Sequence, residues 1–178
     1  VTVADFAVQA VAAHRLRAAF PATVLVAEER AARLREAEQA DMLGVIAAFV
    51  ARVIPGATGA AVCDWIDAGA GASGDDFWTL DPIDGTKGYR RGGQYAIALA
   101  RIQNGRVVCG GLACPVLAEN GDTETMGDGM VLLAARGQGA WQAPLSNPDT
   151  AFTPLAVSAC TEPSRARIMR SYESGHTN

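Results

Sequence analysis

An Asn-Gly pair at residues 104–105, set between two strand-like segments, constrains the fold of this chain more than any other feature. Both residues accept positive φ angles, so this pair is the strongest short signal for a two-residue β-hairpin turn. Residues 94–102 before the pair alternate, so that every second side chain shares one face, and residues 106–113 after it form the expected return strand. The centre of the chain is therefore predicted to be an antiparallel sheet.

Helical spacing of apolar residues marks the first part of the chain. Residues 3–20 carry apolar side chains three and four positions apart, which is typical of a helix with one buried face. Thr2 is placed to cap this helix, and Asp5 three residues later resembles the second half of a capping box. We expect a helix at 3–20, a strand at 23–28, a helix at 30–53 and a loop rich in Gly and Ala at 55–75.

Short apolar and β-branched runs make up the remainder of the chain. We expect strands at 76–80, 94–102, 106–113, 130–136, near 140–141, at 153–158 and at 166–171. Two helices separated by a strand and followed by a run of strands are typical of an α+β fold, in which helices pack on a mostly antiparallel sheet. With 178 residues, the chain is long enough to bury a core and short enough to be one domain.

Composition disfavours several classes of function. With 15 basic and 19 acidic residues the net charge is −4, which argues against a general nucleic-acid binder. No apolar run approaches the roughly 20 residues that a membrane-spanning helix needs, and the printed sequence shows no signal peptide. The four cysteines form no Cys-x-x-Cys pair, so we expect reduced thiols, no zinc site and a cytoplasmic protein.

The most informative stretch for chemistry is the Asp-Pro-Ile-Asp-Gly-Thr run at residues 81–86, which follows an apolar strand. Pro82 favours a turn, so the carboxylates of Asp81 and Asp84 are expected to converge on one side. Two converging carboxylates repel each other unless a cation lies between them, and hard oxygen ligands of this kind suit Mg²⁺. The carbonyl oxygen of Ile83 is a further candidate ligand.

The residues after Asp84 add groups that suit a phosphate. Gly85 permits close backbone approach, and the amides of Gly85 and Thr86, at the start of a short helical turn, are candidates for holding a phosphate. The Thr86 hydroxyl is placed to orient a water. A metal site, a phosphate cradle and a hydroxyl within six residues favour phosphoester hydrolysis. On these residues alone an ordinary turn with exposed aspartates is an equally good interpretation, because Asp-Pro and Asp-Gly turns are common.

Residues 81–86 resemble the signature of the inositol monophosphatase superfamily, the Mg²⁺-dependent, lithium-sensitive phosphatases. Within this superfamily, residues 77–89 followed by residues 91–96 look most like the 3′(2′),5′-bisphosphate nucleotidases. The resemblance implies Mg²⁺ as the cofactor and a small nucleotide as the substrate. The implied reaction removes the 3′-phosphate of adenosine 3′,5′-bisphosphate to give AMP, with 3′-phosphoadenylyl sulfate as a second substrate. The implied fold is the N-terminal half of an inositol-monophosphatase-like α/β/α/β/α sandwich.

The resemblance also assigns roles that the residue types alone do not reveal. Glu28 would bind a metal, although taken alone it reads as a solvated strand end, and Ala27 stands where the family has Gly. Asp5 would activate the attacking water together with Thr86, although taken alone it reads as a first-turn acid favoured by the helix dipole. The implied site residues are Asp5 and Thr86 for catalysis; Glu28, Asp81, Ile83 and Asp84 for the metal; and Gly85, Thr86, Gly175, His176 and Thr177 for the substrate.

The resemblance further implies a second α/β half beyond residue 178, which would supply another metal-binding aspartate and much of the nucleotide pocket. We therefore expect residues 1–178 to be an N-terminal metal- and phosphate-binding domain, a fragment that needs a missing C-terminal half or a partner chain. Two alternatives stay open. The chain is a phosphatase of the same superfamily that acts on inositol phosphate or another sugar phosphate, or it is a truncated domain without catalytic activity.

Overall fold

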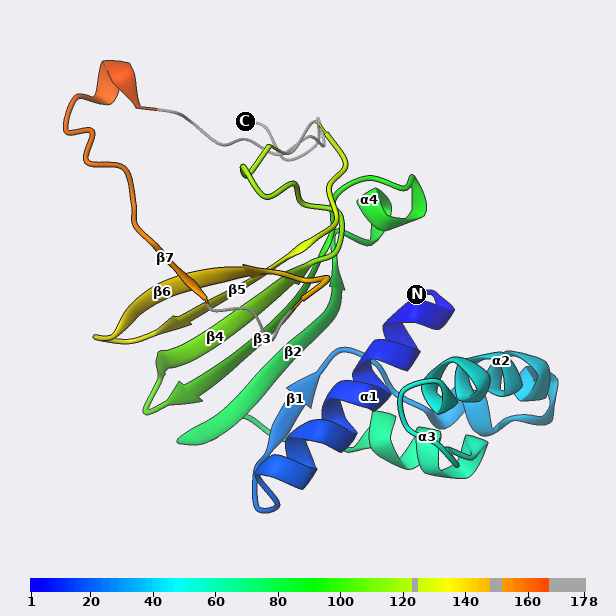
Figure 1. Ribbon diagram of the computed structural model, residues 1–178. Coiled ribbons are helices and arrows are strands. Elements are labelled where there is room, and N and C mark those ends of the chain that lie inside the picture. The colour runs from blue at the N-terminus through cyan, green and yellow to red at the C-terminus, as the bar shows by residue number, and fades with distance from the viewer. Residues whose placement is uncertain (123–124, 148–151, 167–178) are drawn as a thin grey trace.

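In a computed structural model, which describes residues 1–122, 125–147 and 152–166, the chain forms one seven-stranded sheet with a helical layer beside it (Figure 1). The strands lie side by side in the order in which they occur along the chain, β1 to β7. β1 pairs with β2 in parallel, and every later neighbouring pair is antiparallel. The prediction of helices packed on a mostly antiparallel sheet is confirmed.

The described elements have the following bounds. The helices are α1 (Val3–Ala19), α2 (Ala40–Ala51), α3 (Gly59–Asp67) and α4 (Thr86–Arg90), with 3-10 turns η1 (Ala32–Arg35), η2 (Ala37–Gln39) and η3 (Pro163–Arg165). The strands are β1 (Leu25–Ala27), β2 (Asp76–Asp84), β3 (Ala96–Gln103), β4 (Arg106–Cys114), β5 (Met130–Ala135), β6 (Gly139–Pro144) and β7 (Thr153–Leu155).

The two strongest local predictions are confirmed. Asn104 and Gly105 have φ angles of 49° and 71°, as a tight turn between β3 and β4 requires. Near the N-terminus, the Thr2 side chain accepts a hydrogen bond from the backbone of α1, and the Asp5 carboxylate accepts one from the Thr2 amide, which completes the capping box. Both features depend on residues that are neighbours in the sequence.

Two helical predictions are wrong in their bounds. The segment 30–53 is not one helix: it contains η1 and η2, and α2 begins only at Ala40. The segment 55–75 is not a loop throughout, because α3 occupies residues 59–67. Thr58 caps α3 by accepting a hydrogen bond from the Ala61 amide (3.2 Å), and the helix buries Val62 and Ile66. The helix α3 was not predicted from the sequence because Val62 and Ile66 stand among small residues, which make the amphipathic pattern of this helix hard to recognise.

The strand predictions need three corrections. β2 does not end at Leu80 before a turn, but continues to Asp84 through a β-bulge opposite β3. The strand expected at 153–158 is shorter and ends at Leu155. Of the strand expected at 166–171, Ala166 lies outside any strand, and the other positions lie outside the described residues.

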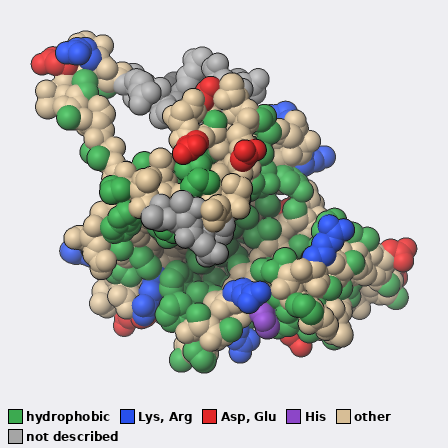
Figure 2. All heavy atoms as spheres, viewed as in Figure 1, with side chains coloured by type: hydrophobic (Ala, Val, Ile, Leu, Met, Phe, Trp, Pro, Cys, Tyr) green, Lys and Arg blue, Asp and Glu red, His purple; other side chains and the backbone are tan. Residues whose placement is uncertain are grey.

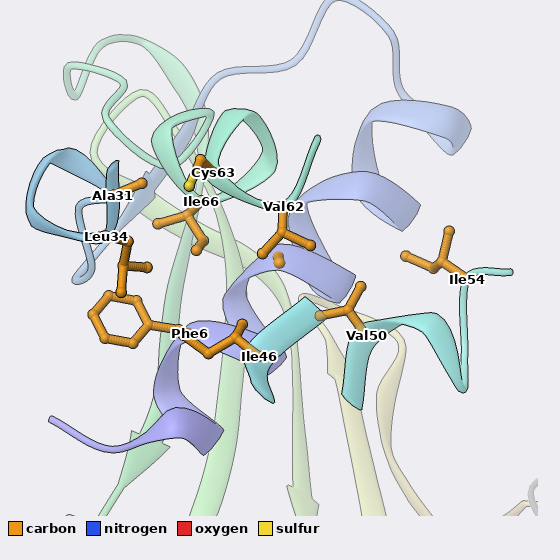
Figure 3. Packing of buried hydrophobic residues seen from close by; sticks show 10 residues of the cluster. Phe6, Ala31, Leu34, Ile46, Val50, Ile54, Val62, Cys63 and Ile66 are labelled. Atoms are coloured by element: carbon orange, nitrogen blue, oxygen red, sulfur yellow. The ribbon is translucent and has the colours of Figure 1, made fainter. Parts of the chain in front are cut away.

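Two apolar clusters hold the layers together. The first joins α1, α2 and α3 and includes Phe6, Leu34, Ile46, Val50 and Ile66, whose side chains meet between the helices (Figure 3). The second joins the inner face of α1 to the sheet through Leu16, Leu25, Ala27 and Leu80, with Ile97 and Leu99 packed against it. One face of the sheet therefore rests on α1.

Further apolar surface is exposed outside these clusters. Side chains of α1, Phe49 of α2 and Val53 just after α2 line a groove that reaches Tyr89 and Ile97. Figure 2 shows hydrophobic side chains on the surface between the sheet and the helical layer. In the described residues, no helix has the length and apolar character that a membrane span requires.

Candidate functional site

The carboxyl ends of β1 and β2 bring the first two acidic segments together. Because these strands are parallel and neighbours, with Val26 beside Thr79 and Ala27 beside Leu80, Glu28 directly after β1 and Asp81 directly after Leu80 lie at the same end of the sheet. Both glutamates lie just beyond the end of β1. Glu28 is exposed, whereas Glu29 is buried, with 6% of its surface accessible.

A β-bulge places Asp81 and Asp84 on the same face of the sheet. Residues three apart in a regular strand point to opposite faces. Here Asp81 pairs with Ala98 and Asp84 pairs with Ala96, so three steps along β2 match two steps along β3. The extra residue restores a common face for the two carboxylates. The predicted convergence of Asp81 and Asp84 thus arises from the bulge and not from a turn at Pro82.

The environment of Asp81 resists a full negative charge. The pKa of Asp81 is raised above its ordinary value, first by desolvation and then by the negative charges of Asp84 and Asp5. One oxygen of the Asp81 carboxylate accepts a hydrogen bond from the Ile83 amide (3.1 Å), which partly offsets this increase. Like charges are therefore crowded at this end of the sheet.

The chain reverses into α4 directly after the two aspartates. Gly85 has a φ angle of 82°, in the left-handed region that disfavours side chains, and it is the N-cap residue directly before α4. The hydroxyl of Thr86 donates a hydrogen bond to the carbonyl oxygen of Ile83 (2.9 Å). A predicted catalytic hydroxyl and a predicted metal-binding carbonyl therefore contact each other.

Asp5 lies on the buried face of α1, with 2% of its surface accessible, and it accepts a hydrogen bond from the Thr2 amide. Its charge raises the pKa of both Asp81 and Glu29, so Asp5 lies within electrostatic reach of both strand ends. Among the hydrogen bonds of the described residues, none joins Asp5 to Thr86. The predicted pair is thus placed at one end of the fold, with each partner bonded elsewhere.

Two residues of this region escaped the sequence analysis as separate site residues. Glu29 has a raised pKa, caused first by burial and then by the charges of Asp5 and Glu28. Gln9 is fully buried on α1, and its side-chain amide bonds to the backbone of Glu29. A signal existed for Gln9, because it stands four positions after Asp5, on the same helix face, among apolar residues.

The donor set fits a hard divalent cation in type and in charge. Asp81, Asp84 and Glu28 supply carboxylates, Ile83 supplies a carbonyl, and the crowded negative charges favour a cation between them. Among the residues that the structure describes, however, no three His, Cys, Asp or Glu side chains already converge into a complete metal site. These residues thus offer part of a coordination sphere.

The sequence-predicted residues divide into two sets. Asp5, Glu28, Asp81, Ile83, Asp84, Gly85 and Thr86 all lie at the ends of β1, β2 and α1 and at the start of α4. Gly175, His176 and Thr177 lie outside the described residues. The expected departure at Ala27 is accommodated, because Ala27 is an ordinary strand residue and is not among the residues with positive φ.

Comparison with known proteins gives a consistent picture. The model of the inositol monophosphatase family matches residues 1–178. A 3′(2′),5′-bisphosphate nucleotidase 1 of Candida albicans is 34% identical over 196 residues, covering 100% of this chain and 54% of its own length. A 3′(2′),5′-bisphosphate nucleotidase of Schizosaccharomyces pombe is 33% identical and is covered over 53% of its length, with 99% of this chain aligned.

A solved structure, Mycobacterium tuberculosis SuhB, aligns with 90% of this chain and 52% of its own, at 22% identity and a TM-score of 0.39. The chain spans about half the length of the curated relatives that it matches.

Proposed function

We propose, from the premise that this chain belongs to the inositol monophosphatase family, that the ends of β1 and β2 form the metal and phosphate site of a phosphomonoester hydrolase. One observation carries the proposal. The bulge in β2 sets Asp81 and Asp84 on one face, beside the strand end that carries Glu28. Carboxylates crowded in this way are stabilised by a divalent cation, which phosphate hydrolysis uses.

The proposed substrate is adenosine 3′,5′-bisphosphate, from which the 3′-phosphate is removed to give AMP, with 3′-phosphoadenylyl sulfate as a second substrate. Support comes from relatives at 33–34% identity that are named 3′(2′),5′-bisphosphate nucleotidases. Residues 1–178 would be the N-terminal metal- and phosphate-binding domain. The remainder of the pocket would come from a second half like that of the longer relatives, or from a partner chain.

The proposed cofactor is Mg²⁺, held by Glu28, Asp81 and Asp84 and by the carbonyl oxygen of Ile83. When bound, Mg²⁺ would lower the pKa of a water and offset phosphate charge. The amides of Gly85 and Thr86 would bind phosphate oxygens and stabilise the charge that shifts onto them.

The proton transfers are proposed for the chain's own side chains. The Thr86 hydroxyl would orient the attacking water, and Asp5 would accept the proton that this water loses. The water oxygen forms a bond to phosphorus while the bond from phosphorus to the ribose 3′-oxygen breaks, and that ribose oxygen takes up a proton. Gly175, His176 and Thr177 are proposed to contact the nucleotide.

Phosphate release tests this function. The chain is incubated with adenosine 3′,5′-bisphosphate or with inositol 1-phosphate, with and without Mg²⁺ and with added Li⁺, and the product is identified. Mg²⁺-dependent, Li⁺-sensitive formation of AMP supports the proposal. Release from inositol 1-phosphate alone reassigns the substrate to a sugar phosphate. No release, both from this chain and from a protein extended to the length of its relatives, contradicts a catalytic role.

A further inference from the structure

Gln9 makes an unusually complete set of hydrogen bonds for a buried side chain. It lies on α1 with none of its surface accessible. Its amide oxygen accepts a hydrogen bond from the Glu29 N–H (2.9 Å). Its amide nitrogen donates to the carbonyl oxygens of Glu29 (2.9 Å) and Ile66 (2.8 Å). Gln9 therefore pairs with both backbone groups of Glu29, as a neighbouring strand would.

The position of Gln9 couples this pairing to the acidic site. Asp5 precedes Gln9 by about one helical turn, and both side chains are buried on the same face of α1. The capping box fixes Asp5 relative to the start of the helix. One face of α1 thus presents a carboxylate and also holds the strand end that carries Glu28 and Glu29.

The fold leaves space for this contact at Gly69, just after α3. A Cβ atom at position 69 would lie 2.8 Å from the amide nitrogen of Gln9 and 2.8 Å from the Cβ of Ala27. The carbonyl of Gly69 accepts a hydrogen bond from the Ala27 amide (2.8 Å). The end of β1 is therefore fitted between Gln9 on one side and the segment after α3 on the other.

The path of the chain just after β1 decides which glutamate is buried. Glu28 is exposed, whereas Glu29 is buried, and its pKa is raised by this burial and then by the charge of Asp5. Arg30 also donates to the carbonyl oxygens of Ala27 (2.8 Å) and Glu29 (2.7 Å), but it lies on the same segment and cannot anchor it to α1.

We propose that Gln9 is a positioning residue of the metal site: its side-chain amide fixes the backbone at Glu29, and this contact holds the neighbouring Glu28 at the end of the sheet where β2 carries Asp81. This inference rests on the proposed function, because it assumes that Glu28 binds the metal. The pairing of Gln9 with Glu29 itself is independent of any metal.

Two variants test the role of Gln9. Gln9→Leu has a similar size and no hydrogen-bonding groups. Val50→Ala is the control, because it removes buried apolar contact on α2 in the same helical cluster and leaves the end of β1 untouched. Both variants are expected to unfold at lower temperature, so thermal stability alone does not separate a positioning role from a structural one.

The separating measurements are Mn²⁺ binding, followed by electron paramagnetic resonance, and hydrogen exchange at the Glu29 amide. We expect Gln9→Leu to weaken Mn²⁺ binding by about tenfold or more, as losses of groups that orient metal ligands do, and Val50→Ala to leave it unchanged. The Glu29 amide should lose protection in Gln9→Leu only. Equal Mn²⁺ affinities for the two variants would overturn the inference.

Failure of the proposed function gives a different result. If the unaltered chain binds no Mn²⁺, the proposed metal site fails, and the inference about Gln9 fails with it as a statement about the metal. The exchange data then decide the remaining claim. Selective loss of Glu29 protection in Gln9→Leu supports the pairing that orients the strand end, and equal protection in both variants overturns it.

Discussion

The surroundings of the Asp81 side chain disfavour its negatively charged form. Burial and the nearby carboxylates of Asp84 and Asp5 raise its pKa, so the folded state holds the proton of Asp81 more tightly than the unfolded state does. The stability that the folded state gains from this tighter proton binding is complete below the ordinary pKa of 3.8. It is lost as the pH rises through the pKa that Asp81 has in the folded state. At neutral pH, without a cation, the ionised carboxylate therefore destabilises the fold.

Asp81→Asn should accordingly stabilise the metal-free chain near pH 7, because it removes a repelled charge and keeps the size of the side chain. We expect Tm to rise by roughly 2–4 °C, the shift that a gain near 1 kcal/mol gives in a domain of this size. The measurement is thermal unfolding in the presence of a chelator. Asp75→Asn, at an exposed position before β2, should leave Tm unchanged. A lower Tm for Asp81→Asn would contradict the repulsion.

At the scale of elements, short sequence motifs correctly predicted those structures that are stabilised by contacts between residues close in the sequence. The Asn104-Gly105 hairpin and the capping box of Thr2 and Asp5 each involve residues close in sequence, and both are present. The helix α3 was missed because its amphipathic pattern is carried by few residues, and its burial depends on contact with α1 and α2. Such contacts cannot be seen in a sequence pattern.

The same distinction applies to the candidate site. The carboxylates of residues 81–86 were identified from their sequence, and the role of Glu28 came from resemblance. The bulge that brings Asp81 and Asp84 to one face depends on pairing with β3, which the local sequence does not specify. The contact of Gln9 with Glu29 joins residues twenty positions apart, so only the folded chain reveals it.

The start of α4 depends on a left-handed residue. Gly85→Ala should destabilise the chain by about 1 kcal/mol, because an L-side chain at a φ of 82° is strained. Gly74→Ala is the matched control, since Gly74 has no positive φ and a Cβ there would meet nothing within 4 Å. Urea denaturation measures both variants. Equal stability of the two would show that α4 does not require this conformation.

At the scale of the whole molecule, the two sheet faces differ. Ile97 and Leu99 face α1, and the opposite face carries an open apolar hollow that extends from Leu112 and Leu132 to Thr79 and Asp81. Exposed apolar surface of this kind is usually a site of protein contact or a cause of aggregation. This surface has no covering element in the described part of the chain.

Leu112→Ser should reduce self-association of this chain, because Leu112 lines the hollow with 41% of its surface exposed. Light scattering over a range of concentrations measures the effect. Val157→Ser is the control: Val157 is 95% exposed and does not line the hollow, so its replacement should change association little. If both variants associate to the same extent as the unaltered chain, the hollow is not the surface through which the chains associate.

A calorimetric titration with Mg²⁺ tests the central claim most directly, because the proposed chemistry requires that Asp81 and Asp84 hold this cation. The chain, Asp81→Asn and Asp75→Asn are titrated under the same conditions. We predict saturable binding by the chain and by Asp75→Asn, and none by Asp81→Asn. Equal binding by all three, or no binding by the unaltered chain, would contradict a Mg²⁺ site at the ends of β1 and β2.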